Sequence, residues 1–432
     1  MRRIIFSVET QYIVSHVIGY IASHIIDRLF NSIHWRFLYQ VLLVAILVIG
    51  CQNFQPREPQ VSPTSDIAAK NCVTNYHPEQ DYFPNKVSVK YAQGFAVEYR
   101  NNYKIVTVKK PWQKANQDFQ YILVQCGTPT PEGFPQAQKI NIPVNSIVTL
   151  STTHLPHLAS LDVVDKLVGV SDTNRVNTPQ VVEKIKTGKV ASVGNNSNLN
   201  IEKILELNPD LVTTYGTGNA QTDSHPKLLE AGLKVVINAE YMENSPLGRS
   251  EWLKFTALFF HQEKRAEEIF KRISERYQEI AKKAKAVKNR PRVFTGFNFK
   301  GTWYVPGCKS YVAQYLADAG ADLLCIENVD GSVPLSFEEV FDRAANADYW
   351  LNVSQNWQSI KDILTEDKRY GDFQAVKLGN VYNNNLRLNE GGGNDYWESG
   401  ISNPDVVLAD LIRILHPDIL PQHQLFYYQK LQ

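Results

Sequence analysis

The chain has 432 residues and a formal net charge of +1, from 45 basic and 44 acidic side chains. This length predicts two or three domains. A nearly neutral chain lacks the excess of lysine and arginine that marks nucleic-acid-binding proteins, so we expect no nucleic-acid partner. Apolar residues make up 43% of the sequence, which is ordinary for a globular protein and allows each domain its own core.

Residues 1–50 are predicted to be a leader that ends in a lipidation signal. Basic residues precede a short apolar run that ends in the letters VIGC at 48–51. The run is shorter than a typical membrane-spanning helix. Its end resembles a bacterial lipobox, whose cysteine is lipidated and becomes the mature N-terminus, so we expect Cys51 to carry a lipid anchor. The alternative is an uncleaved membrane anchor in which Cys51 has no special role.

Residues 51–70 are predicted to be a flexible tether, because they are rich in proline, glutamine and serine and offer little to bury. A small antiparallel β-unit is expected at 71–145. Alternating apolar and polar residues at 87–124 form strand-like runs, and Asn101-Asn102 between two of these runs is typical of a tight hairpin turn.

The N-terminal lobe is predicted at 146–249, where short apolar strands alternate with helices. Strands are expected at 147–150, 167–170, 211–214 and 234–238. Helices are expected near 179–186, 200–207 and 226–231. Strands that are joined through helices predict a parallel sheet with right-handed crossovers.

A single long linker helix is predicted at 250–290. Its apolar residues recur at spacings of three, four or seven, which places them on one helical face. They are Trp252, Phe255, Phe259, Ala266, Ile269, Ile273, Tyr277, Ile280 and Ala284. Pro291 marks the end of this helix. A helix of this length resists bending, so we expect little movement between the parts that it joins.

The same alternation of strands and helices predicts a C-terminal lobe at 291–432. Residues 301–307 are expected to form a turn-rich loop. The predicted fold class is therefore α/β, with two Rossmann-like lobes that contain parallel sheets and are joined by a single long α-helix, plus the small N-terminal antiparallel β-unit.

Four cysteines remain after Cys51. An exported protein meets an oxidising compartment, where an even number of cysteines favours disulfides. We predict the pairs Cys72–Cys126 and Cys308–Cys325. Three pairings are possible from the sequence, and four buried free thiols are the alternative.

The sequence contains no HExxH, GxSxG, CxxC or Walker phosphate-binding motif, so we expect no enzyme activity. Gly216 and Gly218 follow a predicted strand, as in a dinucleotide-binding loop. The third glycine of that motif is replaced by Gln221, which argues against a nucleotide site. A cell-surface enzyme is the alternative from another functional class, and it lacks an evident nucleophile–base pair.

Aromatic and polar residues gather in the segments that follow the predicted strands. Ligands bind beyond the carboxyl ends of strands in open α/β sheets, so these residues are candidates for a ligand-binding cleft between the two lobes. The candidates are His154, Asn195, Tyr215, Trp303, Tyr304, Tyr396 and Trp397, together with Arg249 at the start of the linker helix. The alternative for each is a packing role in its own loop, and for Arg249 a role in holding the linker.

Three stretches resemble a known family. They are SIVTLSTTHLPHLASLDVVDKLVGVS at 146–171, ASVGNNSNLNIEKILELNPDLVTTYG at 191–216 and PLSFEEVFDRAANADYWL at 334–351. The order of these motifs is similar to that in the periplasmic-binding proteins for vitamin B12 and iron–siderophore complexes, the substrate-capture components of ABC importers. The resemblance covers roughly residues 145–415. It implies two Rossmann-like lobes joined by one long helix.

The resemblance also implies a function. We expect a monomeric, lipid-anchored protein of the periplasm or cell envelope that binds a ferric siderophore and needs no cofactor. Its partners would be an ABC permease and the ATPase subunits of that importer. Glu202 and Glu338, or the neighbouring Glu339, match the glutamates that dock into arginine pockets of the permease.

Two other ligands remain open. Cobalamin is an alternative, although Asn195 and Val333 stand where the vitamin B12 protein has tryptophans. A bare zinc or manganese ion is a second alternative, with His154, His157 and His225 as ligands.

Overall fold

The computed structural model describes residues 72–432 except 196–197 and 220. The predicted leader, the tether and Cys51 lie outside the described residues. Everything described belongs to one compact unit of the chain. Within this part of the chain, no helix combines the length and the apolar character that a membrane span requires.

The β-unit is a four-stranded sheet with the order β1-β2-β3-β4. The strands are β1 (Phe95–Tyr99), β2 (Tyr103–Val108), β3 (Phe119–Gln125) and β4 (Gln138–Ile142). The pairs β1–β2 and β2–β3 are antiparallel, as predicted, but β3 and β4 are parallel. The difference arises because residues 126–137 form a crossover connection, which parallel neighbours require.

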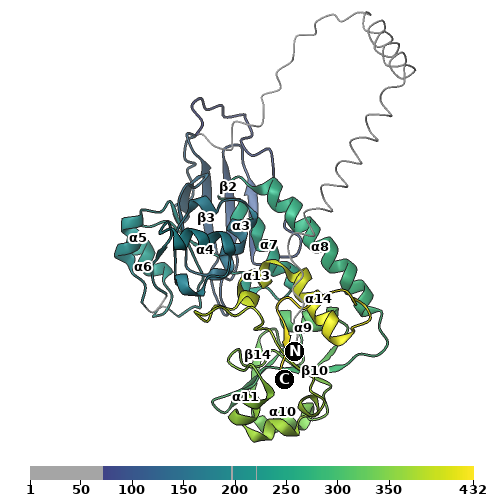
Figure 1. Ribbon diagram of the computed structural model, residues 1–432. Helices are drawn as coiled ribbons and strands as arrows, with labels where there is room; N and C mark the ends of the chain where they lie inside the picture. The colour runs from purple at the N-terminus through teal and green to yellow at the C-terminus, as the bar shows by residue number, and fades with distance from the viewer. Residues whose placement is uncertain (1–71, 196–197, 220) are drawn as a thin grey trace, which may run out of the picture. The chain divides into compact units, whose positions relative to one another are not determined.

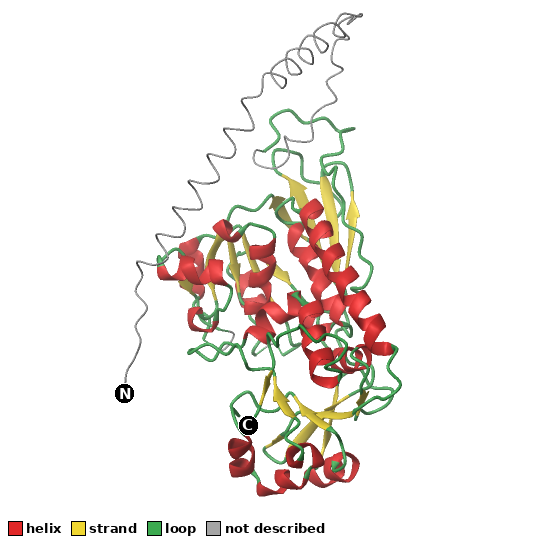
Figure 2. Ribbon diagram, turned by 45° about the vertical axis from the view of Figure 1, so that its right-hand side comes forward, coloured by secondary structure: helices red, strands yellow, loops and turns green. Residues whose placement is uncertain are grey.

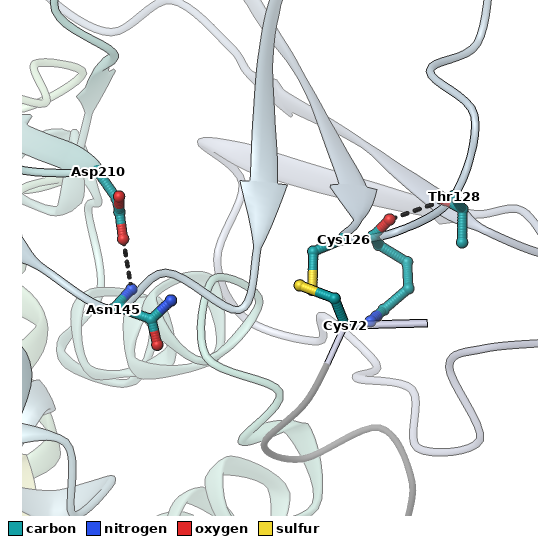
Figure 3. Close-up of a disulfide and its surroundings, with 6 residues drawn as sticks. Cys72, Cys126, Thr128, Asn145 and Asp210 are labelled. Atoms are coloured by element: carbon teal, nitrogen blue, oxygen red, sulfur yellow. Dashed lines mark hydrogen bonds between the residues drawn. A yellow bond between two sulfur atoms is a disulfide. The ribbon is translucent and has the colours of Figure 1, made fainter. Parts of the chain in front are cut away.

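The disulfide Cys72–Cys126 closes one end of the β-unit (Figure 3). The amide of Val73 donates to Cys126 O at 2.9 Å, and the amide of Cys126 donates to Ile142 O at 2.9 Å. Nearby, the amide of Asn145 donates to the Asp210 carboxylate at 2.7 Å. The end of the β-unit is therefore tied to the lobe that follows.

The N-terminal lobe contains a five-stranded parallel sheet with the order β7-β6-β5-β8-β9. Its strands are β5 (Ile147–Thr149), β6 (Leu167–Val170), β7 (Ala191–Ser192), β8 (Leu211–Thr214) and β9 (Val235–Ile237). The helices between and beside them are α3 (Leu155–Ser160), α4 (Pro179–Lys186), α5 (Ile201–Leu207) and α6 (His225–Glu230). This lobe confirms the predicted parallel sheet.

The predicted single linker helix is two helices, α7 (Pro246–Ala257) and α8 (Glu263–Lys285). Carbonyl groups at the break bond to the β-unit and the segment that follows it: Lys104 Nζ donates to Leu258 O at 2.8 Å, and the amide of Val144 donates to Phe259 O at 2.9 Å. His261 then adopts a left-handed conformation with φ 56°, which ends the helical path.

The C-terminal lobe has a five-stranded sheet with the order β13-β10-β15-β16-β17, parallel except for its last strand. Its strands are β10 (Arg292–Thr295), β13 (Asp322–Leu323), β15 (Tyr349–Leu351), β16 (Val381–Asn383) and β17 (Gln429–Lys430). Its helices are α9 (Tyr311–Asp318), α10 (Phe337–Ala344), α11 (Ile360–Glu366), α12 (Gln374–Lys377), α13 (Asp395–Ser402) and α14 (Pro404–Leu415). The mixed α/β fold class with parallel sheets is thus confirmed for both lobes.

A second, antiparallel sheet in this lobe consists of β11 (Asn298–Phe299), β12 (Thr302–Pro306) and β14 (Ser332–Leu335). The loop predicted at 301–307 is therefore largely a strand. Cys308–Cys325, the second predicted disulfide, joins the segment after β12 to the segment after β13. Both disulfide predictions are confirmed.

The β-unit shares a continuous core with the N-terminal lobe and α7. In two views its sheet lies beside α7 and α8 (Figure 1 and Figure 2). The rings of Phe95 and Trp252 pack with centroids 4.9 Å apart. The buried Glu251 carboxylate of α7 accepts hydrogen bonds from the amides of Lys90, Tyr91 and Ala92 at 2.5–3.0 Å. The β-unit is therefore integral to this half of the protein.

Candidate functional site

A cavity of about 480 Å³ lies between the two lobes. This volume is in the range of small-molecule sites, roughly 300–1,000 Å³. Its N-terminal wall consists of Gln113, Thr217, Tyr241, Met242, Glu243, Asn244 and Arg249. Its C-terminal wall consists of Pro306, Ser310, Tyr311, Val312, Asp330, Gly331 and Ser332. Other hollows lie along α8, and one of them is also lined by the β-unit and both lobes. The present cavity differs from that hollow because Arg249 and the start of α9 line it.

Arg249 joins the two walls. It lies in the first turn of α7, where the Ser245 side chain accepts a hydrogen bond from the Gly248 amide at 3.0 Å and so caps the helix. The Arg249 guanidinium donates to Tyr241 O at 2.6 Å and to Glu243 O at 3.2 Å. It also lies 3.6 Å from the ring centroid of Tyr311 in the other lobe. These contacts fix a positive charge at the cavity.

The start of α9 adds partial positive charge from the opposite wall. The Ser310 side chain caps this helix by accepting a hydrogen bond from the Ala313 amide at 3.3 Å. The amides of Tyr311 and Val312, in the first turn, have no intrahelical acceptor. Because both residues line the cavity together with Arg249, this region favours an anionic group.

Glu243 lines the cavity, but its carboxylate is occupied by hydrogen bonds within the protein. Its carboxylate accepts hydrogen bonds from the amides of Gln93 at 3.0 Å and Gly94 at 2.8 Å, and from Trp252 Nε1 at 2.9 Å. These donors compensate its negative charge. Asp330, by contrast, is exposed at the C-terminal wall.

Tyr241 supplies the cavity with a phenol group that stays neutral. Burial, and then the nearby Asp223 and Glu240 carboxylates, raise the pKa of Tyr241 to about 12. Its hydroxyl donates to Gly216 O at 2.5 Å and lies 3.3 Å from Pro111 O. Tyr241 therefore links the wall of the cavity to two neighbouring loops.

Of the eight residues predicted to bind the ligand, Arg249 lines the cavity. His154, Trp303 and Tyr396 do not, because they are buried, with exposed fractions of 3%, 0% and 4%. Trp303 packs against Phe294 and Trp350 in the core of the C-terminal lobe. The positions of these three contradict a role in contacting ligand in this cavity.

The other four predicted residues lie elsewhere on the lobes. Tyr304 on β12, Trp397 on α13 and Asn195 after β7 are exposed, while Tyr215 is partly buried in the loop after β8. The prediction placed them in the cleft because they follow strands. Some of the loops that follow strands line the cavity and others lie outside it. Following a strand therefore does not by itself place a residue in the cavity.

His154 forms a buried polar cluster inside the N-terminal lobe. Its Nδ1 lies 3.2 Å from Thr213 Oγ1, and its Nε2 lies 4.0 Å from the Glu240 carboxylate. Burial lowers the pKa of His154 to about 3 and raises the pKa of Glu240. The imidazole is therefore neutral at pH 7, and the cluster positions the segment that carries Tyr241.

The predicted alternative of a bare metal site is contradicted. His157 Nδ1 lies 3.0 Å from Thr256 Oγ1 inside the lobe, and the His225 ring packs on Trp112 with centroids 5.5 Å apart. His154 belongs to the buried cluster beside Thr213. Across the described residues, no three His, Cys, Asp or Glu side chains are grouped so that they could hold a metal ion.

The predicted docking glutamates lie in the first turns of two helices, one in each lobe. Glu202 is exposed on α5, and Glu338 is exposed on α10, where Arg369 Nη1 lies 3.1 Å from its carboxylate. The neighbouring Glu339 carboxylate accepts hydrogen bonds at 2.8 Å from the backbone amide and hydroxyl of Ser336 in a capping box. Glu338 is therefore the freer of the two adjacent glutamates.

The sequence did not single out Gln113, Tyr241 or Tyr311 as candidates. Tyr311 had a local signal, because Ser310 is a helix cap that follows a strand. Gln113 and Tyr241 had none, because each reaches the cavity through contacts between segments far apart in the sequence.

A model of the periplasmic binding protein family matches residues 147–385. An uncharacterized lipoprotein of Methanocaldococcus jannaschii is 29% identical over 301 residues, which cover 67% of this chain and 70% of that relative. An uncharacterized ABC transporter substrate-binding lipoprotein of Bacillus subtilis is 28% identical over 142 residues, which cover 33% of this chain and 42% of that relative. Among solved structures, a possible iron-binding (periplasmic solute-binding) protein from Staphylococcus epidermidis is 20% identical, with a TM-score of 0.49; the match covers 63% of this chain and 99% of that one.

Proposed function

The chain belongs to the periplasmic binding protein family, and from this premise we propose that it is the substrate-binding component of an ABC importer. In this role the protein makes and breaks no covalent bonds. It captures a solute between its lobes and presents the solute to a permease that works with ATPase subunits. The relative from Bacillus subtilis that carries this description in its name supports the proposal.

The proposed ligand is an anionic metal chelate, a ferric siderophore in the first place. The observation that carries this choice is Arg249, whose guanidinium is held between the lobes by Tyr241 O and the Tyr311 ring. The α9 amides favour negative charge at the same place. Tyr241 and Tyr311 also line the cavity, and aromatic side chains are typical of sites for large, partly apolar ligands. Iron enters here as cargo inside the chelate. Cobalamin is the alternative ligand within the same family.

Delivery to the permease is proposed to use Glu202 and Glu338. Exposed carboxylates on separate lobes can align the protein on a pair of basic pockets and steer the encounter. For Glu338, docking would exchange the arginine of its own lobe, Arg369, for an arginine of the permease.

A lipid anchor at Cys51 is proposed to hold the protein at the outer face of the membrane as a monomer. The VIGC letters at 48–51 support this anchor, and so does the lipoprotein name of the relative from Methanocaldococcus jannaschii. A tethered binding protein stays close to its permease, which raises its effective concentration there.

A titration of the purified protein tests the ligand choice. Ferric siderophores, cobalamin, haem and Zn²⁺ are added separately while heat release is measured by calorimetry. The proposal expects saturable binding of a ferric siderophore, and binding that weakens at least about tenfold in Arg249→Gln, because a charge-assisted contact contributes roughly 1.5–3 kcal/mol. Binding of cobalamin alone would replace the siderophore with the alternative ligand.

A further inference from the structure

The β-unit lies outside the residues that match the family, yet one of its loops reaches the cavity. The loop at 109–118 joins β2 to β3, and its residue Gln113 lines the cavity beside Thr217 and Asn244. Gln113 is exposed, so its amide group faces space that a ligand can occupy. The wall of the cavity therefore includes a side chain from outside both lobes.

Trp112 joins this loop to the N-terminal lobe. A Cβ atom at Gly216 would lie 2.6 Å from Trp112 Cε3, and a Cβ at Gly218 would lie 2.6 Å from Trp112 Cδ1. Gly218 has a positive φ of 81°, which by itself favours glycine. The backbone of Gly216 makes no such demand, so the close approach of the indole accounts for the missing side chain there.

Two further sets of contacts stabilise the loop at 109–118 and the segment at 215–219. The Asp223 carboxylate accepts hydrogen bonds from the amides of Thr217 at 2.8 Å and Gly218 at 2.9 Å. The Tyr241 hydroxyl contacts Pro111 O on one loop and Gly216 O on the other. Gly216 and Gly218, which resembled part of a nucleotide-binding motif, therefore leave the space into which the Trp112 indole packs.

We propose that the loop at 109–118 is part of the ligand-binding site, in which Trp112 is a positioning residue and Gln113 a specificity-determining residue. Trp112 fixes the backbone at 215–219, and so the place of Thr217 in the cavity wall. Gln113 offers one hydrogen-bond donor and one acceptor group to the periphery of the chelate, where siderophores carry their amides and hydroxyls. This inference rests on the proposed function.

The contacts of Trp112 distinguish its positioning role from simple packing within the β-unit. A loop that only closed the β-unit would bury Trp112 in its own sheet. The indole packs on Phe119 of that sheet, at 5.6 Å between ring centroids, but also on His225 of α6 in the N-terminal lobe, at 5.5 Å. It therefore bridges two structural parts at the point where the cavity begins.

Amide hydrogen exchange tests the positioning role without any ligand. We expect Trp112→Ala to speed exchange at the Thr217 and Gly218 amides by about tenfold or more, and Gly216→Ala to do the same by displacing the indole. Trp112→Phe keeps a ring and should show a smaller change, and the β5 amides report any general loss of stability. Unchanged exchange at Thr217 and Gly218 in both Trp112→Ala and Gly216→Ala would overturn the positioning role.

Calorimetry with ferric siderophores tests the specificity role. Gln113→Ala should weaken binding by about three- to tenfold, the effect of one lost hydrogen bond. Gln117→Ala removes the same amide group from an exposed position of the same loop and should leave the affinity unchanged. Equal affinities of the two variants would overturn the role of Gln113. If the wild-type protein binds no siderophore, cobalamin or haem, the proposed function and the ligand contact of Gln113 both fail, whereas hydrogen exchange still decides the role of Trp112.

Discussion

The Glu398 carboxylate in the C-terminal lobe accepts a hydrogen bond of 2.6 Å from the backbone amide of Thr178 in the N-terminal lobe. The Thr178 hydroxyl donates to the same carboxylate at 2.5 Å, and the Asn177 amide donates at 2.9 Å. Asn389 Nδ2 also donates to Val176 O at 3.2 Å. The lobes are therefore also joined by side chains that lie outside the α7–α8 linker.

This second connection predicts that Glu398 limits the movement of the lobes. Glu398→Gln replaces one carboxylate oxygen with an NH2 group that faces two of these donors, and it should lower the free energy of unfolding by about 1–3 kcal/mol. Urea denaturation measures this loss, with the exposed Glu390→Gln as the control. Fluorophores placed one on each lobe should report a broader distance distribution in Glu398→Gln. An unchanged distribution would mean that Glu398 does not limit the movement of the lobes.

The break between α7 and α8 shows what the sequence could and could not predict. The parallel sheets follow from local patterns, and they were predicted. The break between the two helices could not be predicted. Both α7 and α8 bury an apolar face, and the helical spacing of apolar residues continues through Phe259. The decisive contacts come from Lys104 and Val144, which lie more than a hundred residues earlier in the chain.

The cavity was less predictable than the fold. Arg249 was identified because it begins the linker. Trp303 was misplaced because its segment is a strand, whose alternation directs this side chain into the core. Gln113 belongs to a unit that the resemblance does not cover, so neither local pattern nor family motif could connect it to the cavity.

Arg249→Lys separates the charge of Arg249 from its geometry. Lysine keeps the positive charge but loses the planar group that contacts Tyr241 O and lies over Tyr311. We expect Arg249→Lys to retain part of the siderophore affinity that Arg249→Gln loses, perceptible as an intermediate dissociation constant in calorimetry. The melting temperature of both variants shows how much stability is lost with the contacts to Tyr241 O and Glu243 O. If both variants bind like the wild type, the anionic part of the chelate lies elsewhere.

Charge reversal at the docking glutamates should uncouple capture from transport. Glu202→Lys and Glu338→Lys are expected to leave siderophore affinity unchanged and to abolish uptake in cells, because a lysine would repel the basic pockets proposed on the permease. Asp342→Lys is the matched control on α10, since it reverses the charge of another exposed carboxylate on the same helix. Normal uptake by Glu338→Lys would contradict the docking role.

The buried histidines predict a loss of stability in mild acid. Burial, reinforced by the nearby His154, lowers the pKa of His157 to about 3, against an ordinary value of about 6.5. Below pH 6.5 the unfolded chain therefore binds a proton that the folded protein excludes, and stability falls as the pH decreases toward 3. Each such group contributes a slope of about 1.4 kcal/mol per pH unit.

Replacing His157 should reduce this slope. His157→Gln cannot take up the proton, so its free energy of unfolding should fall less steeply between pH 6 and pH 5, by up to about 1.4 kcal/mol per pH unit. Urea denaturation at several pH values measures the slope. The exposed His77→Gln is the control and should keep the wild-type slope. Parallel curves for all three proteins would show that His157 takes no part in the acid response.

The buried ion pair of Lys104 and Glu263 predicts a non-additive response to mutation. Lys104, from β2, contacts the Glu263 carboxylate at the start of α8 and also donates to Leu258 O at 2.8 Å. Lys104→Met leaves Glu263 buried without its partner and should lower the free energy of unfolding by about 3–5 kcal/mol. Adding Glu263→Gln removes the uncompensated charge, so the double variant should recover part of that loss. Urea denaturation of the single and double variants measures the coupling. Additive losses would mean that the two side chains act independently.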